Sequence, residues 1–147
     1  MEIRVWLTRG VVIRPGIYYW PARRAPRKKG FILEPATSFS VRAERGGSDA
    51  MLTLTGDLDI NGAPELKKTF DSLDGFEGRV IIDLRSVTFM DSMGLGSLID
   101  GRNRLESDGA MVVLVAGEGP AGRLLALTKL DQSFPMFDSI EAARAST

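Results

Sequence analysis

The sequence predicts an α/β domain built on a mixed β-sheet. Apolar and polar residues alternate on both sides of a glycine-rich turn, which is typical of an antiparallel hairpin. Two short apolar runs, at 80–82 and 111–115, are typical of strands buried on both faces. Segments with helical apolar spacing follow these strands. Such alternation implies right-handed crossovers and a largely parallel sheet after the hairpin, flanked by about four helices.

The first elements follow from local patterns. We expect the hairpin strands over 39–45 and 51–55, joined by the turn at 46–49. Pro64 suits the start of a helix, because an amide hydrogen would be unpaired at that position. The apolar stripe of this first helix consists of Leu66, Phe70 and Leu73.

The later elements continue the alternation. A second amphipathic helix is defined by Leu95, Leu98, Ile99 and Leu105. Gly109 is expected to end that helix in the left-handed conformation. Pro120 opens a third helix, whose predicted apolar stripe is Leu124, Leu127 and Leu130. After a short apolar stretch at 135–137, the last helix is expected to start at Asp138, with Glu141 as its capping-box partner.

Composition excludes several classes of protein. With 147 residues, the chain has the size of one ordinary domain, and no apolar run approaches the ~18 residues of a membrane helix. The chain contains no Cys and no His, so thiol nucleophiles, His-based triads and the usual zinc sites are excluded. Because we find no secretory signal, we expect a cytoplasmic protein.

The charge is distributed unevenly along the chain. Residues 1–30 hold eight basic residues and one acidic residue, a net charge of +7, whereas the other residues hold 11 basic and 18 acidic, a net charge of −7. A basic arm for nucleic acid or anionic lipid is one interpretation of this segment. The interpretation that we favour is a disordered extension, with the domain spanning 31–147.

Two further motifs point to enzyme chemistry, and each has a simpler interpretation. The segment 117–122 reads G-x-G-x-x-G between a strand and a helix, but only 25 residues follow it, which favours a glycine-rich turn over a dinucleotide site. Four aspartates near predicted strand ends could offer oxygen ligands to Mg²⁺. Because short acids commonly cap loops and helices, we expect no metal site from Asp57, Asp59, Asp83 and Asp91.

The segment 83–96 is the most informative part of the chain. It reads as a strand, a tight loop and a helix start, with Asp91 and Ser92 at the helix N-terminus. Gly94 and Gly96 leave the first turn without side chains. Exposed amide groups there favour an anion, and the glycines allow a partner backbone to approach closely. The alternative is a helix cap with glycines that serve packing, and the spacing alone leaves both open.

This segment, DLRSVTFMDSMGLG, resembles the signature of the bacterial anti-sigma factor antagonists of the STAS-domain family, roughly D-L-S-x-V-x-F-M-D-S-[ST]-G-L. Two other stretches are similar to the family in the same order. The segment 54–59, LTGDLD, resembles L-x-G-[ED]-L-D, and 127–139 is similar to the C-terminal stretch of the family. The resemblance covers about residues 38–145, and it implies a STAS-like sheet flanked by helices.

The resemblance implies a binding protein, and neither an enzyme nor a protein with a cofactor. Members dock on an anti-sigma factor of the ATP-binding serine-kinase type, so that a sigma factor is released. No direct contact with nucleic acid or a membrane is implied. The residues implied to lie at or under the partner surface are Asp57, Asp59, Asp91, Ser92, Met93, Gly94 and Leu95.

The sequence departs from the family pattern at the phosphoacceptor. That position holds Met93, which has no hydroxyl, and Ser92 is its neighbour. A shift of one residue rotates a side chain by about 100° around a helix, which is a poor substitute for the in-line geometry of a kinase site. We therefore expect an antagonist without the phosphoserine switch, with a shifted switch at Ser92 as the alternative.

Two other functions stay open. One is a STAS module in another assembly, such as a stress-signalling scaffold or a lipid-transport accessory subunit. The other is a small Mg²⁺- or nucleotide-dependent α/β enzyme. The identity of the bound partner distinguishes the first two functions, and titration with Mg²⁺ or nucleotide tests the third.

Overall fold

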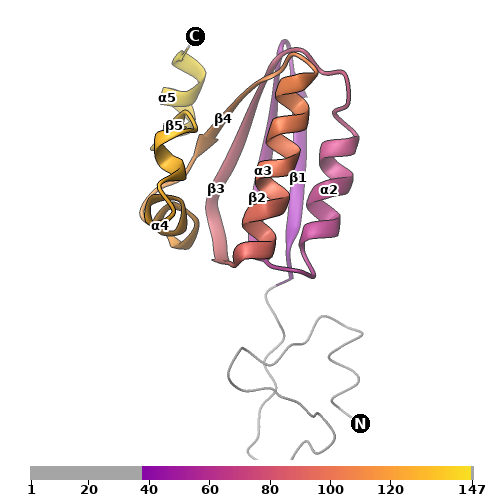
Figure 1. Cartoon of the computed structure of the whole chain (residues 1–147). Helices are drawn as coiled ribbons and strands as arrows, with labels where there is room; N and C mark the ends of the chain where they lie inside the picture. Colours follow the sequence, from indigo (N-terminus) through magenta and orange to yellow (C-terminus); the bar gives the residue numbers. More distant parts are fainter. Residues whose placement is uncertain (1–37, 147) are drawn as a thin grey trace, which may run out of the picture. The chain divides into compact units, whose positions relative to one another are not determined.

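The structure, a computed structural model, describes residues 38–146 (Figure 1). The predicted basic extension over residues 1–30 lies outside the described residues. The sheet has five strands in the order β1-β2-β3-β4-β5. β1 is antiparallel to β2, and the other neighbouring strands are parallel. The predicted mixed sheet, with an antiparallel hairpin followed by parallel strands and four α-helices in the described part of the chain, is confirmed.

The strands are β1 Ser40–Gly46, β2 Asp49–Leu58, β3 Arg79–Met90, β4 Met111–Val115 and β5 Met136–Phe137. The α-helices are α2 Ala63–Asp71, α3 Ser92–Ser107, α4 Pro120–Leu127 and α5 Ile140–Ala145, and a 3-10 helix, η2, covers Leu130–Gln132. Among these described helices, none is both long and apolar enough to cross a membrane.

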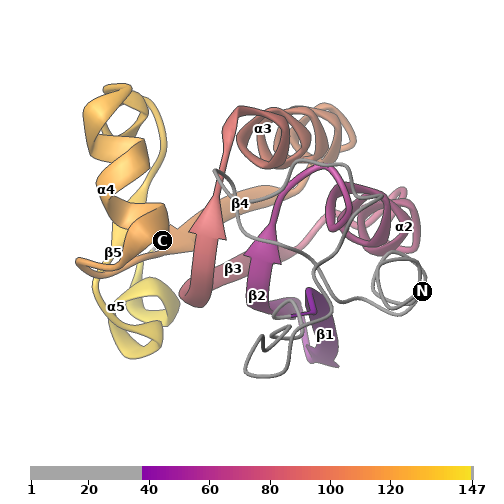
Figure 2. The same cartoon turned by 90° about the horizontal axis from the view of Figure 1, so that it is seen from below.

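The helices cover the two faces of the sheet unequally. α2 and α3 pack side by side on one face, and α5 lies on the other (Figure 2). The main core lies between the sheet and α2, α3 and α4. A smaller cluster under α5 contains Ile81, Val113, Val115 and Ala143. This alternation of buried residues along β3 and β4 explains why the runs at 80–82 and 111–115 are apolar throughout.

Two strands are longer than predicted. β2 continues to Leu58, because a register shift near Gly56, whose φ is 96°, lets the strand pass the break in its alternating pattern. β3 continues to Met90, although β4 pairs only with its residues 79–83. α4 packs against β3 and contributes Ala121 and Leu125 to the same core. The long β3 carries the chain to the start of α3.

Two predictions about the C-terminal helices are wrong. The buried residues of α4 are Ala121 and Leu125, whereas Leu127 is 79% exposed and the helix ends there. The predicted stripe of Leu124, Leu127 and Leu130 therefore does not exist as one helical face, because Leu130 belongs to η2.

The last helix, α5, begins one residue later than expected. Ser139, and not Asp138, is its N-cap, because the Ser139 hydroxyl accepts a hydrogen bond from the amide of Ala142 at 3.1 Å. Glu141 lies one position short of the capping-box position.

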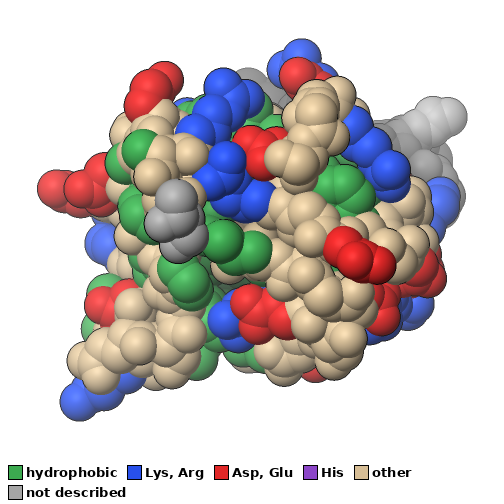
Figure 3. Space-filling view, turned by 90° about the horizontal axis from the view of Figure 1, so that it is seen from above, with side chains coloured by type: hydrophobic (Ala, Val, Ile, Leu, Met, Phe, Trp, Pro, Cys, Tyr) green, Lys and Arg blue, Asp and Glu red, His purple; other side chains and the backbone are tan. Residues whose placement is uncertain are grey.

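The last glycine of the motif at 117–122 serves packing. A methyl group on Gly122 would overlap the carbonyl oxygen of Gly117, so the start of α4 lies directly on the preceding loop. This contact supports the interpretation as a glycine-rich turn. At the end of the molecule that Figure 3 shows, acidic and basic side chains lie beside one another and no single charge dominates.

Candidate protein-docking site

The predicted site residues gather where β2 and β3 end and where α2 and α3 begin (Figure 2). Leu58, the last residue of β2, pairs with Met90, the last residue of β3. The loops that follow these strands therefore leave the sheet at the same edge, which is where open α/β sheets bind their partners and ligands. The structure brings Asp57 and Asp59 together with the segment 91–95 at this edge.

Asp91 is the N-cap of α3. One of its carboxylate oxygens accepts hydrogen bonds from the amides of Met93, at 3.0 Å, and Gly94, at 2.9 Å. These two amides are thus satisfied by the chain itself, so the structure supports the helix cap and not an anion site on them. The cap also fixes the direction in which the first turn of α3 leaves the sheet.

The two glycines of this turn differ in their surroundings. A methyl group on Gly94 would overlap the carbonyl oxygen of Leu58, so only glycine lets α3 start this close to the end of β2. Gly96 has open space around its α-carbon. Gly94 thus serves internal packing, and Gly96 leaves the surface of α3 bare.

Asp59 holds the turn between β2 and α2. Its carboxylate accepts hydrogen bonds from the amides of Asn61, at 2.8 Å, and Gly62, at 3.1 Å. Ile60 lies between these anchored residues and is 60% exposed, although it is a large apolar residue. Ile60 was not among the predicted site residues, because an isolated apolar residue inside a polar turn is a weak signal in a sequence.

Asp57 and Leu95 lie beneath this surface. Asp57 is only 5% exposed, and one of its carboxylate oxygens accepts a hydrogen bond from the Thr88 hydroxyl at 2.7 Å. This bond ties the end of β2 to β3. Leu95 is 8% exposed and belongs to the main core. Both residues support the exposed loops from below.

Asp83 does not belong to the site. It was expected near the end of a strand, but β3 continues past it to Met90. In the register of β2 and β3 it lies opposite Thr53, whereas Asp57 lies opposite Phe89, six residues further along β3 and so about 20 Å away. Burial favours a raised pKa for Asp83, but two hydrogen bonds from the Arg85 guanidinium, both at 2.9 Å, hold the pKa below its ordinary value. Across residues 38–146 there is no cluster of three acidic groups that could hold a metal ion.

Met93 is the most prominent exposed residue of the α3 start. It is 55% exposed, and it lines the same groove as Ile60. Ser92 is also exposed. The site is therefore a pair of exposed apolar side chains on a frame of internally bonded loops.

The fold is that of a small α/β domain, and two exposed apolar side chains, Ile60 and Met93, lie at one edge of its sheet. The chain belongs to the STAS domain family, whose model matches residues 40–143. Among curated proteins, it is 23% identical over 88 residues to a STAS-domain containing protein of Pseudomonas aeruginosa (strain UCBPP-PA14), which covers 60% of this chain and 87% of that protein.

Solved structures are similar over most of the domain. An anti-sigma factor antagonist from Mycobacterium paratuberculosis is 25% identical, with a TM-score of 0.65, covering 72% of this chain and 91% of that one. A candidate anti-sigma factor antagonist from Thermotoga maritima is 26% identical, with a TM-score of 0.64, covering 71% and 91%. The predicted STAS fold is thus confirmed.

Proposed function

We propose that this chain is an anti-sigma factor antagonist of the cytoplasm. It binds an anti-sigma factor of the ATP-binding serine-kinase type and thereby releases a sigma factor. The similarity to proteins of that description supports the general role. The proposed contact surface is the edge of the sheet around Ile60 and Met93.

The exposure of Ile60 and Met93 is the observation that carries this proposal. Exposed apolar side chains that lie together often mark interaction sites, and these two line the same groove. Here both stand on backbone that is held by Asp59 and Asp91, so the surface is organised before binding. A preorganised surface loses little conformational entropy when a partner docks, which suits it to protein binding.

The same surface lacks a hydroxyl at the position where phosphorylation would release the partner. Phosphorylation adds about −1.5 to −2 charges to a hydroxyl, and that charge can break a closely packed contact. Met93 has no hydroxyl, and the neighbouring Ser92 leaves the helix axis in a direction about 100° away. We therefore propose that binding follows the amounts of the two proteins and is not switched by phosphate.

The experiment is affinity capture with three forms of the tagged full chain. The wild type is compared with Met93→Glu and with Met111→Glu, a matched control in which an exposed methionine at the start of β4 is changed. A carboxylate buried without a partner costs several kcal/mol, so Met93→Glu should lose the captured partner. Mass spectrometry should identify a serine-kinase-type anti-sigma factor with the wild type and with Met111→Glu. Capture of a transport complex instead would contradict the proposal.

Phosphorylation is tested with the captured kinase and ATP. The wild type should stay unmodified, whereas Met93→Ser should accept phosphate, because the hydroxyl then lies at the family's acceptor position. Stoichiometric phosphate on Ser92 of the wild type, abolished by Ser92→Ala, would show that the switch has shifted by one residue and was not lost.

A further inference from the structure

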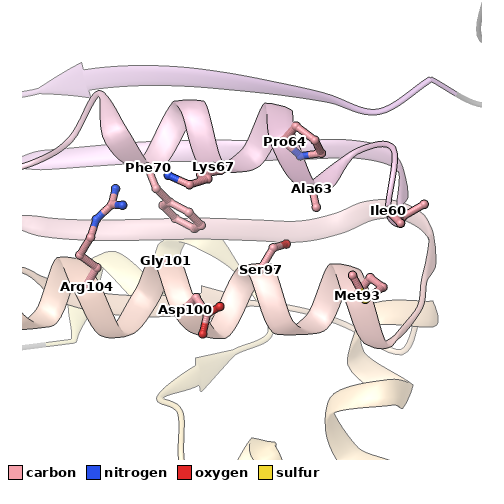
Figure 4. A pocket seen from close by; sticks show the side chains of 10 residues that line it. All are labelled: Ile60, Ala63, Pro64, Lys67, Phe70, Met93, Ser97, Asp100, Gly101 and Arg104. Carbon is pink, nitrogen blue, oxygen red and sulfur yellow. The ribbon is translucent and has the colours of Figure 1, made fainter.

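A groove of about 500 Å³ runs between α2 and α3, and it starts at the docking site (Figure 4). Ile60 and Met93 lie at one end, and the ring of Phe70 lies toward the other. Its walls are mainly apolar along the α2 side, through Ala63 and Pro64. Gly101 allows the Phe70 ring to lie against α3, since a methyl group there would overlap the ring.

The walls determine which backbone the groove can take. Both walls are α-helices, whose backbone amides and carbonyls are already bonded within each helix. An extended segment lying in the groove would find no strand edge and would leave its own backbone groups unpaired. An α-helix satisfies its backbone internally, so it is the form of chain that this groove suits.

The charges at the rim of the groove determine which charge a bound segment should carry. Lys67 and Arg104 are already paired with acids of α2 and the following turn, because Lys67 lies 3.3 Å from Asp71 and Arg104 lies 2.7 Å from Asp71 and 3.1 Å from Asp74. Asp100 also lines the groove, and it forms no ion pair or hydrogen bond with any residue of 38–146. The unpaired charge of the groove is therefore negative.

We infer that the α2–α3 groove takes a short amphipathic helix of the partner protein, with one Lys or Arg facing Asp100. The partner is the anti-sigma factor, so this identity rests on the proposed function. Met93 and Arg104 are 11 residues apart on α3, which corresponds to about 16 Å and to roughly three turns of the docked helix. Its apolar residues would cover the exposed side chains of Ile60 and Met93.

The first test uses defined peptides and does not depend on the anti-sigma factor. The probes are two blocked, alanine-based helical peptides of about 12 residues with the same leucine stripe, one with a lysine beside the stripe and one with a glutamate. In an NMR titration of the labelled full chain, the lysine peptide should shift the amides of Ser97 and Gly101. It should bind about fivefold more tightly than the glutamate peptide, since one pair attracts and the other repels.

Charge reversal identifies the residue that is responsible. Asp100→Lys should invert the preference between the two peptides. Asp131→Lys changes the net charge equally at an exposed position of η2, away from the groove, and should leave the preference intact. Equal affinity for both peptides, or shifts confined to other surfaces, would overturn the inference.

The second test connects the groove to the partner. With the captured anti-sigma factor, Asp100→Lys should weaken binding about fivefold, and Asp131→Lys should not. Binding that depends on Met93 but is indifferent to Asp100→Lys would overturn the groove and leave the proposed function standing. If the peptides bind in the groove but affinity capture yields no anti-sigma factor, the proposed function would be refuted and the groove would remain a helix-docking site.

Discussion

Gly94 and Gly96 lie two residues apart in α3, yet alanine should have opposite effects at the two positions. Alanine favours a helix over glycine by about 1 kcal/mol when nothing else changes. Gly96 meets that condition, because the added methyl group enters open space. At Gly94 the methyl group would overlap the carbonyl oxygen of Leu58, which is backbone and cannot turn aside.

The magnitudes follow from these contacts. Gly96→Ala should raise the free energy of unfolding by about 0.5–1 kcal/mol. Gly94→Ala should lower the free energy of unfolding by about 1–3 kcal/mol. The added methyl group either overpacks the contact with Leu58 or forces the start of α3 away from β2. The two variants should therefore differ by roughly 1.5–4 kcal/mol.

Urea unfolding followed by circular dichroism measures this difference directly. The slope of the transition should be the same for both variants, so that the midpoints report stability alone. If Gly94→Ala unfolds at the same midpoint as Gly96→Ala or above it, then the close approach of α3 to Leu58 is absent and the packing argument is refuted.

Three further predictions concern the cap, the partly buried ion pair of Asp83 and Arg85, and the basic extension. Asp91→Ala should cost about 1–2 kcal/mol of stability in the same urea assay, and Asp91→Asn should cost less because the amide oxygen can still accept; equal losses would argue against the cap. Arg85 holds the folded-state pKa of Asp83 below its ordinary value of 3.8, so the stabilisation is complete above that pH and is lost as the pH falls through the folded-state pKa. Stability measured from pH 5 to 2 should therefore fall less steeply in Asp83→Asn than in the wild type. Removal of residues 1–30 should leave the melting temperature and partner affinity unchanged, and a marked loss of either would show that the extension contributes to the domain.

The sequence predicted the elements whose signal is local. The hairpin, the helices α2 and α3, and the helix end at Gly109, whose φ is 106°, all follow from short-range spacing. Asp59 and Asp91 could be recognised as caps for the same reason, since a cap contacts amides two or three residues away. These features needed no knowledge of the tertiary structure.

Other features depend on contacts that are distant in sequence. Asp83 looked like a strand-end residue, because nothing local shows that β3 continues to Met90 beyond its pairing with β4. Leu127 looked like a core residue, but it lies about 200° around α4 from the buried Leu125 and so faces outward. The outward position of Ile60 results from the hydrogen bonds on both sides of it, and an apolar residue by itself does not reveal exposure.

The contact between Phe70 and Gly101 has a consequence for the dynamics of the domain. The Phe70 ring is 1% exposed and lies on the backbone of α3, so α2 cannot detach without uncovering the helix beside it. The amides of both helices should then exchange with deuterium through one shared opening. α5, with six residues on a separate small cluster, should exchange earlier and independently. The two helices should thus behave as a single rigid unit.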